Sequence, residues 1–455
     1  MTDDGFTRRG FLRLAGGALA ATAVGCNSGS GTATSKAGTA STTAGAKGPR
    51  QLRIAQWSHY VAGYDQWWDE AYTKGWGERN GIEVVVDHFD INQAPGHADA
   101  EVAAQRGHDL FHLKLASPAP LQDQVIDHRE IIEEVEAKVG KMVPFVERSI
   151  FNPKTRTYFA FSDSWEPNPV HFRMDLWEPV GRRPDTWDDV LAGGARLKAQ
   201  GHPVGIGMGG DPESNLTLLG LMHGYGASIQ DEQGTVVINS RGTVEAVKVG
   251  AAVLREAMTP DVFGWDITSN NRYLISGRAS LIVNPIAAVR ALEAQDPALA
   301  AKVQLLPAPS GSHGRLSVHG VSTYVIWKFS ENQEAAKRFL VDLATAYREP
   351  FLQSQYLQIP SFPGAIGDFA ALVANDTRSQ PPGKYRLLAD VTGWMTNLGH
   401  PGHTNAANDE VVKASIISQM FATAARGEMS PEEAVKAAEA KIKPIYDKWR
   451  EQGKI

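Results

Sequence analysis

The sequence has little of three things that would each define a class of protein. Its 455 residues contain one cysteine, Cys26, so no disulfide can form within the chain. The formal net charge is −6, and the lack of a basic excess argues against a nucleic-acid partner. Beyond the N-terminal region, no apolar run approaches the ~20 residues that a membrane-spanning helix needs. With 42% hydrophobic and 21% charged residues, we expect a water-soluble globular body, long enough for two domains.

What the chain does have is an N-terminal segment organised like an export signal. Arg8 and Arg9 precede an apolar run at residues 14–25, which is too short to span a bilayer and ends in small residues. A pair of arginines shortly before an apolar run resembles a twin-arginine (Tat) signal. An ordinary Sec signal with a chance arginine pair is the alternative. We predict that residues 1–25 are an export signal.

The position of Cys26 explains why an exported protein would keep a single thiol. Cys26 directly follows Ala23-Val24-Gly25, and small residues before a cysteine resemble a bacterial lipobox. Cleavage there would make Cys26 the first residue of the mature chain, where several acyl chains would anchor it in the membrane. A free thiol in an unprocessed tail is the alternative. Residues 26–50 are rich in Ser, Thr, Gly and Ala, which predicts a flexible tether.

The body of the chain begins with an alternation of strand and helix patterns. Strands are predicted at residues 51–57, 82–87 and 108–113, with helices at 64–80 and 98–106. This alternation favours βαβ units and a largely parallel sheet, hence an α/β fold class. Ligands bind beyond the carboxyl ends of strands in such sheets. Residues 57–60 and 114–117 are therefore expected at the rim of a crevice.

The rest of the chain continues the mixed α/β pattern. Helix starts are predicted at Thr186, Asp211, Ser330 and Ser430, where a capping residue precedes a helical segment. Short strands are predicted at residues 203–208, 279–283 and 322–327. A continuous helix is predicted at 410–426, and another from Ser430 to about residue 442. No internal repeat is found.

Several segments resemble the family 1 extracellular solute-binding proteins, the relatives of maltose-binding protein. The best match is Pro184-Asp-Thr186-Trp187-Asp188-Asp189-Val190, against the family pattern Pro-x-Thr-Trp-Asp-Glu-Leu. Weaker matches follow in the family's order at residues 158–161, 168–178, 270–283, 305–309, 320–322 and 334–340. The strand and turn at residues 171–174 depart from the family pattern, which argues against carrying over a maltose-like specificity.

This resemblance implies a two-lobed periplasmic-binding-protein fold in which the chain crosses the hinge several times. Crossings are expected near residues 161–165, 284–286 and 347–350. The first lobe would comprise residues 51–162 plus 285–346, and the second 163–284 plus 347–455. The ligand would lie between the lobes, and the closed form would dock on the permease of an ABC importer.

A neutral sugar would need carboxylates and amides for its hydroxyls and aromatic rings for its apolar face. Candidate ligand-binding residues were chosen at loop positions that match the family's ligand segments. They are Trp57, His59, Tyr60, Ser117, Trp165, Glu166, Asn168, His223, Tyr225, Asn284, Ser322, Trp394 and Asn397. No catalytic residue, cofactor or resident metal is expected.

Three other interpretations are weaker. Gly205-x-Gly207-x-x-Gly210 matches a dinucleotide fingerprint, but it lies mid-chain after a very short strand and lacks the acidic residue that should follow. The histidine pairs 108/112 and 400/403 lack the thiolates or tight carboxylate cluster of a metal site, so a metal receptor remains an alternative only. A secreted carbohydrate-active hydrolase is the other alternative, because a pair of catalytic carboxylates leaves no sequence signature.

The sequence thus predicts a monomeric sugar receptor of an ABC importer and not an enzyme. The ligand could be a monosaccharide, an oligosaccharide, a polyol or a glycerophosphodiester. The protein is expected at the outer face of the cytoplasmic membrane or in the periplasm, anchored through a lipid on Cys26.

Overall fold

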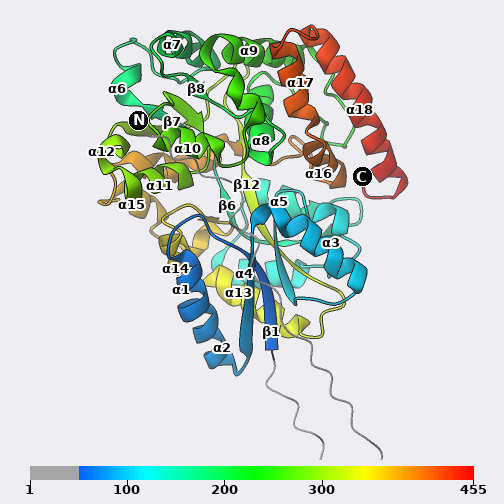
Figure 1. Cartoon of the computed structure of the whole chain (residues 1–455). Coiled ribbons are helices and arrows are strands. Elements are labelled where there is room, and N and C mark those ends of the chain that lie inside the picture. The colour runs from blue at the N-terminus through cyan, green and yellow to red at the C-terminus, as the bar shows by residue number, and fades with distance from the viewer. Residues whose placement is uncertain (1–50) are drawn as a thin grey trace, which may run out of the picture. The chain divides into compact units, whose positions relative to one another are not determined.

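The structure, a computed structural model, describes residues 51–455. The predicted export signal, the tether and Cys26 lie outside the described residues. Within residues 51–455, no helix combines the length and apolarity needed to cross a membrane. The described part contains two principal β-sheets, each packed against helices (Figure 1).

The first sheet has six strands in the order β13-β6-β12-β3-β1-β2. Their bounds are β1 Gln51–Trp57, β2 Glu83–Phe89, β3 Leu110–Lys114, β6 Phe161–Glu166, β12 Gly320–Ile326 and β13 Ile359–Pro360. Strands β1, β2 and β3 are parallel, as the βαβ pattern predicted. Strand β12 is antiparallel to both β3 and β6, so it joins the N-terminal units to the middle of the chain.

The second sheet has four strands in the order β10-β7-β9-β8. Their bounds are β7 Val170–Arg173, β8 Val204–Gly205, β9 Leu281–Val283 and β10 Val303–Leu306. Alternate residues of β9 face opposite sides: Leu281 and Val283 enter one apolar cluster, and Ile282 enters the other. The sheet is therefore buried on both faces, which explains its continuous apolar runs.

The sheet topology departs from the predicted lobe boundaries at three strands. Residues 163–166 of β6 were expected in the second lobe, but they lie in the six-stranded sheet. Strand β10 was expected in the first lobe, but it pairs with β7 in the four-stranded sheet. Strand β13 was expected in the second lobe, but it pairs with β6 in the six-stranded sheet. Local patterns do not reveal these pairings, because each depends on a partner strand more than 100 residues away along the chain. Below, "first lobe" and "second lobe" mean the elements around the six-stranded and the four-stranded sheet.

Helices complete both lobes. Those of the N-terminal units are α1 Tyr64–Trp67, α2 Lys74–Asn80, α3 Ala94–Ala104, α4 Arg129–Val139, α5 Pro144–Ile150 and, from later in the chain, α13 Gln333–Thr345. The remainder are α6 Met174–Trp177, α7 Trp187–Ala199, α8 Pro212–Gly224, α9 Arg241–Ala257, α10 Ser269–Ile275, α11 Ala287–Gln295, α12 Pro297–Ala300, α14 Arg348–Gln353, α15 Phe369–Ala374, α16 Ala406–Lys413, α17 Ile416–Ala425 and α18 Pro431–Glu451. Helices α7, α9, α17 and α18 gather at the far end of the second lobe (Figure 1).

Shorter elements fill the connections. A π-helical turn at Trp68–Thr73 joins α1 to α2, and the 3₁₀ turns are Ile91–Gln93 (η2), Ala119–Leu121, Pro260–Gly264, Pro363–Ala365 and Lys384–Trp394. Two further two-stranded sheets pair β4 Phe151–Asn152 with β5 Thr157–Tyr158 and β11 Ser317–Val318 with β14 Met395–Thr396.

Most predicted helix starts are confirmed by their caps. The Thr186 side chain accepts a hydrogen bond from the backbone N–H of Asp189 at 3.0 Å, and Asp211 accepts one from Ser214 at 3.0 Å. Ser430 forms a full capping box before α18. These caps satisfy backbone donors that the first helical turn leaves unpaired.

Two helix predictions are wrong. Ser330 does not cap α13, because its hydroxyl donates to Asp109 Oδ1 at 2.7 Å and the helix begins only at Gln333. The helix predicted at 410–426 is broken into α16 and α17 at Ser415, whose φ of 54° lies in the left-handed region. The break redirects the chain, and it leaves α16 as a separate element that reaches the first lobe near Ala119–Leu121.

One carboxylate–histidine cluster holds the start of β3 in place. His108 Nε2 lies 2.8 Å from Asp87 Oδ2, and His108 Nδ1 pairs with Glu101. Glu101 Oε2 also accepts a hydrogen bond from Trp327 Nε1 at 3.0 Å. Burial alone would lower the pKa of His108, but the two carboxylates raise it above its ordinary value. His108 is thus occupied by structural partners, and within residues 51–455 no three His, Cys, Asp or Glu side chains are placed so that they could hold a metal ion.

This cluster predicts a pH-dependent contribution to stability. Because the folded-state pKa of His108 is raised, its stabilisation is complete below the unfolded pKa and is lost as pH rises through the folded pKa. We expect His108→Gln to lower the free energy of unfolding by about 1 kcal/mol more near pH 5.5 than near pH 8.5. Chemical denaturation at both pH values measures this. Equal losses at both pH values would contradict it.

Candidate ligand-binding site

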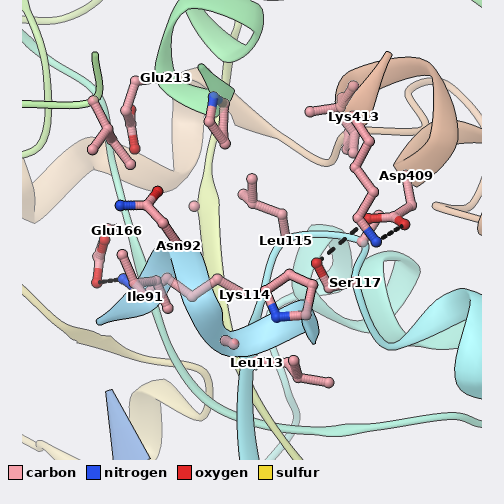
Figure 2. A pocket seen from close by; sticks show the side chains of 18 residues that line it. Ile91, Asn92, Leu113, Lys114, Leu115, Ser117, Glu166, Glu213, Asp409 and Lys413 are labelled. Carbon is pink, nitrogen blue, oxygen red and sulfur yellow. Dashed lines mark hydrogen bonds and ion pairs between the residues drawn. The ribbon is translucent and has the colours of Figure 1, made fainter. Parts of the chain in front are cut away.

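A cavity of about 170 Å³ lies where the carboxyl end of β3 faces the second lobe. On the same measure a single water molecule needs only ~10–15 Å³, so a small organic molecule fits. Its walls come from η2, from the segment after β3, from the start of α8 and from α16 (Figure 2). The residues are Ile91, Asn92, Ala94, Pro95, Leu113, Lys114, Leu115, Ala116, Ser117, Glu166, Pro212, Glu213, Ile267, Gly320, Leu398, Asp409, Val412 and Lys413.

A second, smaller cavity of about 40 Å³ adjoins the first. The two share Ile91, Lys114, Glu166, Glu213 and Ile267, so they form one continuous cleft. The smaller cavity adds Tyr60, Asn271, Asn284, Pro285, Ala287 and Leu357. "The cleft" below means these two cavities together. It is the crevice that the βαβ pattern placed beyond the carboxyl ends of the strands.

An enclosed ion pair forms the floor of the cleft. Lys114 ends β3 and Glu166 ends β6, and β12 lies between these two strands. Lys114 Nζ lies 2.5 Å from Glu166 Oε1, and the two side chains are only 15% and 7% exposed. The ammonium group also lies 4.2 Å from the centroid of the Trp57 ring. Little water reaches the pair, so each charge depends on the other for compensation.

A second ion pair lies at the α16 end of the cleft. Lys413 Nζ lies 2.7 Å from Asp409 Oδ2, one helical turn away on α16. The Ser117 hydroxyl, from the segment after β3, lies 3.4 Å from Asp409 Oδ1 (Figure 2). Burial raises the pKa of Asp409, and Lys413 opposes that rise. The Ser117–Asp409 contact joins the first lobe to α16 directly.

Two asparagines, Asn271 and Asn284, line the opposite end of the cleft, and a third, Asn270, contacts them from outside the wall. Asn284, just after β9, donates from Nδ2 to Asn270 Oδ1 at 3.0 Å and also to Asn271. Asn270 donates in turn to the backbone carbonyl of Val283 at 3.2 Å. Amide groups arranged in this way can both donate and accept, as a polyhydroxylated ligand requires.

Four of the predicted ligand-binding residues line the cleft. They are Tyr60, Ser117, Glu166 and Asn284. Two more lie just behind it. The Trp57 ring is fully buried beneath Lys114 and makes an edge contact with Tyr60 at 5.2 Å. His59 stacks on Tyr64 at 3.9 Å, and burial together with Lys114 lowers the pKa of His59 to about 3, so its ring is neutral.

The remaining predicted residues are not part of the cleft wall. Trp165 packs against Phe145 and donates to the carbonyl of Pro360, and Trp394 belongs to the first apolar cluster. The indoles of Trp57, Trp165 and Trp394 are 0%, 0% and 6% exposed, so none lines the cleft. The three rings lie in β1, in β6 and in the 3₁₀ turn Lys384–Trp394 instead of in loops, and burial of such a large ring is worth several kcal/mol. Ligand stacking on these indoles stays a prediction.

Three of the polar residues outside the wall, His223, Asn168 and Asn397, hydrogen-bond to backbone carbonyls. His223 Nδ1 lies 2.8 Å from the carbonyl of Ala227, and Tyr225 packs against the second apolar cluster. Asn168 donates to the carbonyl of Val318, and Asn397 donates to that of Gly402. Ser322 lies within β12, with Lys114 and Ser164 as its neighbours on the adjacent strands. Their contact with ligand also stays a prediction.

Sequence reasoning missed several cleft residues that have polar side chains. They are Asn92, Lys114, Glu213, Asn271, Asp409 and Lys413. Lys114 lay in the segment expected at the crevice rim, and Glu213 follows a correctly predicted helix start. A search of helix N-termini for acidic residues would have found Glu213. Asp409 and Lys413 lie on α16, which ends before the chain break at Ser415, and no local pattern marks that break.

Comparison with known proteins identifies the family. Residues 60–346, more than half of the chain, match the sequence profile of the bacterial extracellular solute-binding proteins. The chain belongs to this family. The resemblance seen in the sequence is thereby confirmed, and the family consists of binding proteins.

The relatives are distant. A protein of Brucella abortus (strain 2308), classed provisionally as a binding protein, is 24% identical over 202 residues, covering 43% of this chain and 48% of that protein. The chain therefore matches about half the length of this curated relative. An ABC transporter solute-binding protein of Thermotoga lettingae bound with α-D-tagatose is 17% identical with a TM-score of 0.72, covering 87% of this chain and 100% of that one.

A second solved structure supports the same fold. It is a sugar transporter from Arthrobacter chlorophenolicus with bound laminaribiose, 16% identical with a TM-score of 0.73, covering 87% of this chain and 99% of that one. At such identities the likeness shows the fold alone. The fold is thus a two-lobed α/β binding-protein fold, as predicted.

The Lys114–Glu166 pair predicts a large stability cost when one partner is removed. Lys114→Met leaves the Glu166 carboxylate enclosed without its cation, so we expect the free energy of unfolding to fall by about 3 kcal/mol. Adding Glu166→Gln in the same chain should recover part of that loss, because the uncompensated charge is gone. Guanidinium denaturation measures both variants.

Lys138→Met is the matched control for the Lys114→Met variant. Lys138 pairs with Glu134 on α4 with both side chains about half exposed, so its removal should cost under about 0.5 kcal/mol. A loss of that small size for Lys114→Met, or no recovery in the double variant, would show that the pair is not energetically coupled.

Proposed function

We propose that this protein is the solute-binding receptor of an ABC importer, and that it binds a sugar or another small polyhydroxylated molecule in the cleft. The observation that carries the proposal is the composition of the cleft wall. Hydrogen-bonding side chains reach it from the first lobe (Tyr60, Ser117, Glu166) and from the second (Asn271, Asn284). A ligand held by both sets would favour the closed arrangement of the lobes.

The chemistry of the wall suits hydroxyl groups on an apolar frame. Carboxylate and amide oxygens accept hydrogen bonds from hydroxyls, and the amide and ammonium groups donate to them. Ile91, Ile267 and Leu398 supply apolar surface between these polar groups. Closure would exclude water, so any ligand hydroxyl left without a partner would weaken binding. The sugar complexes of the two structural relatives are consistent with such a ligand.

Binding of a polyhydroxylated ligand is the first expected outcome. In a thermal-shift screen of the full chain with monosaccharides, disaccharides, polyols and glycerophosphodiesters, a ligand at 100 times its Kd should stabilise the protein by ~2.7 kcal/mol. A response to metal ions alone would contradict the proposal. Cleavage of a bound oligosaccharide would instead identify a hydrolase.

A matched pair of variants locates the site. Asn284→Ala removes an amide from the cleft wall and should weaken binding of the screened ligand about tenfold, since a hydrogen bond is worth ~1 kcal/mol or more. Tyr225→Phe removes a hydroxyl from a predicted residue outside the wall and should leave the Kd unchanged. Titration calorimetry compares them, and equal effects of the two substitutions would place the ligand elsewhere.

We also propose that the receptor is exported, that it is anchored through a lipid on Cys26 and that it delivers its ligand to a membrane permease. Fractionation of the native bacterium tests the anchor. The wild-type protein should sediment with membranes, whereas Cys26→Ser should be released in soluble form, because the acyl chains are attached only through that thiol. Membrane association that survives the substitution would refute lipidation at Cys26.

A further inference from the structure

The charged groups of the cleft do not balance. Among residues 51–455, the charged side chains on its wall are Lys114, Glu166, Glu213, Asp409 and Lys413. Lys114 pairs with Glu166 and Lys413 pairs with Asp409. Glu213 has no such partner, because no hydrogen bond or ion pair joins its carboxylate to any other residue of the described chain. The cleft therefore has one carboxyl group without a cationic partner.

Glu213 lies where that charge is hard to leave uncompensated. It is in the first turn of α8, next to Pro212, and both cavities of the cleft touch it. Apolar Ile91 and Ile267 line the same two cavities. The titratable groups that act on Glu213 are Glu166, Asp211 and Lys114, and the field of Glu213 reaches Tyr60.

These neighbours disfavour the ionised carboxylate in the empty cleft. Burial, followed by the charges of Glu166 and Asp211, raises the pKa of Glu213 to about 8, and Lys114 only partly opposes this. The N-terminus of α8 opposes this rise in the pKa of Glu213, because helix N-termini favour negative charge. A cation brought next to Glu213 would offset the repulsion and restore the ionised form.

A second acceptor points into the same space. Asn92 donates from Nδ2 to Asp90 Oδ1 at 2.9 Å, which fixes the orientation of its amide. Figure 2 shows the amide end of Asn92 on the side of Glu213, and the hydrogen bond to Asp90 uses its nitrogen, so the oxygen remains as an acceptor. No hydrogen bond to either acceptor forms within residues 51–455, so both suit a group that carries several N–H donors and a positive charge.

We propose that the ligand of the cleft carries a protonated amine, which pairs with Glu213 and donates to Asn92, so that the substrate class is an amino sugar or aminocyclitol. This inference rests on the proposed function, because it assigns a class of ligand to the same cleft. Closing the lobes over a neutral sugar would enclose an uncompensated carboxylate or require it to hold a proton. Sugar acids and sugar phosphates would find no unpaired cation in the cleft, because Lys114 and Lys413 already pair with carboxylates.

Titration calorimetry on the full chain with matched compounds tests this. The probes are glucosamine, galactosamine and an aminocyclitol, each beside a neutral counterpart such as glucose, N-acetylglucosamine or inositol. At least one amine should bind, at least about 30-fold more tightly than its counterpart, as expected for a desolvated charge pair. Glu213→Gln should abolish that preference. Glu245→Gln, which removes one negative charge from the surface of α9, should leave it intact.

A proton count gives an independent readout that needs no variant. Free Glu213 is mostly protonated near pH 7, and a bound ammonium would stabilise its ionised form. Binding of an amine should therefore release a proton, which calorimetry in buffers of different ionisation enthalpy measures, and the Kd should fall as pH rises from about 6 to about 8. The wild-type protein provides this result even if Glu213→Gln fails to fold.

The outcomes separate the two proposals. Neutral sugars that bind as tightly as their amines, with no proton release, would overturn the amine proposal and leave the proposed function standing. Preferential binding of a sugar acid or phosphate would do the same. If no compound of either class binds, the proposed function fails, and the amine proposal fails with it.

Discussion

The enclosed Lys114–Glu166 pair is the interaction on which the geometry of the cleft depends. It links the ends of β3 and β6 across β12, and these three strands come from the beginning, the middle and the later part of the chain. The pair fixes where the floor of the cleft lies, because neither charge can leave its partner without a large desolvation cost. Trp57 packs beneath the lysine and keeps water from that side.

The other parts of the cleft wall are brought to this ion pair by segments of both lobes. The segment after β3 brings Ser117 to Asp409 on α16, and the segment after β9 brings Asn284 into the cleft from the second lobe. The protein thus presents neutralised charge pairs at two points, amides at a third and one unpaired carboxylate at Glu213. We propose that a wall with that arrangement selects ligands by charge as well as by hydroxyl pattern.

Much of the fold was predictable because its signals are local. The βαβ units, the caps at Thr186, Asp211 and Ser430, and the family segments gave the α/β class and the two lobes. The strands β10 and β13 were assigned to the wrong sheets, since their partners are distant in sequence. The break at Ser415 was also missed, because a serine in the left-handed region has no strong sequence signature.

The site was predicted less well than the fold, for a physical reason. The rule that ligands bind beyond the carboxyl ends of parallel strands predicted the position of the crevice correctly. Of the predicted residues, Tyr60, Ser117, Glu166 and Asn284 line it. Tryptophans were expected there as stacking surfaces, but the interior offers a large indole more stabilisation than a cleft wall does. The charge balance of the cleft depends on residues from β3, β6, α8 and α16 meeting in space, which sequence order does not reveal.

We propose that one small molecule is held simultaneously by both lobes in this cleft, and a crystal structure of the full chain with a bound ligand from the screen would test this. The ligand should lie within hydrogen-bond distance of Glu166 from the first lobe and of Glu213 or Asn284 from the second. A ligand bound to one lobe alone, or at another surface, would contradict it.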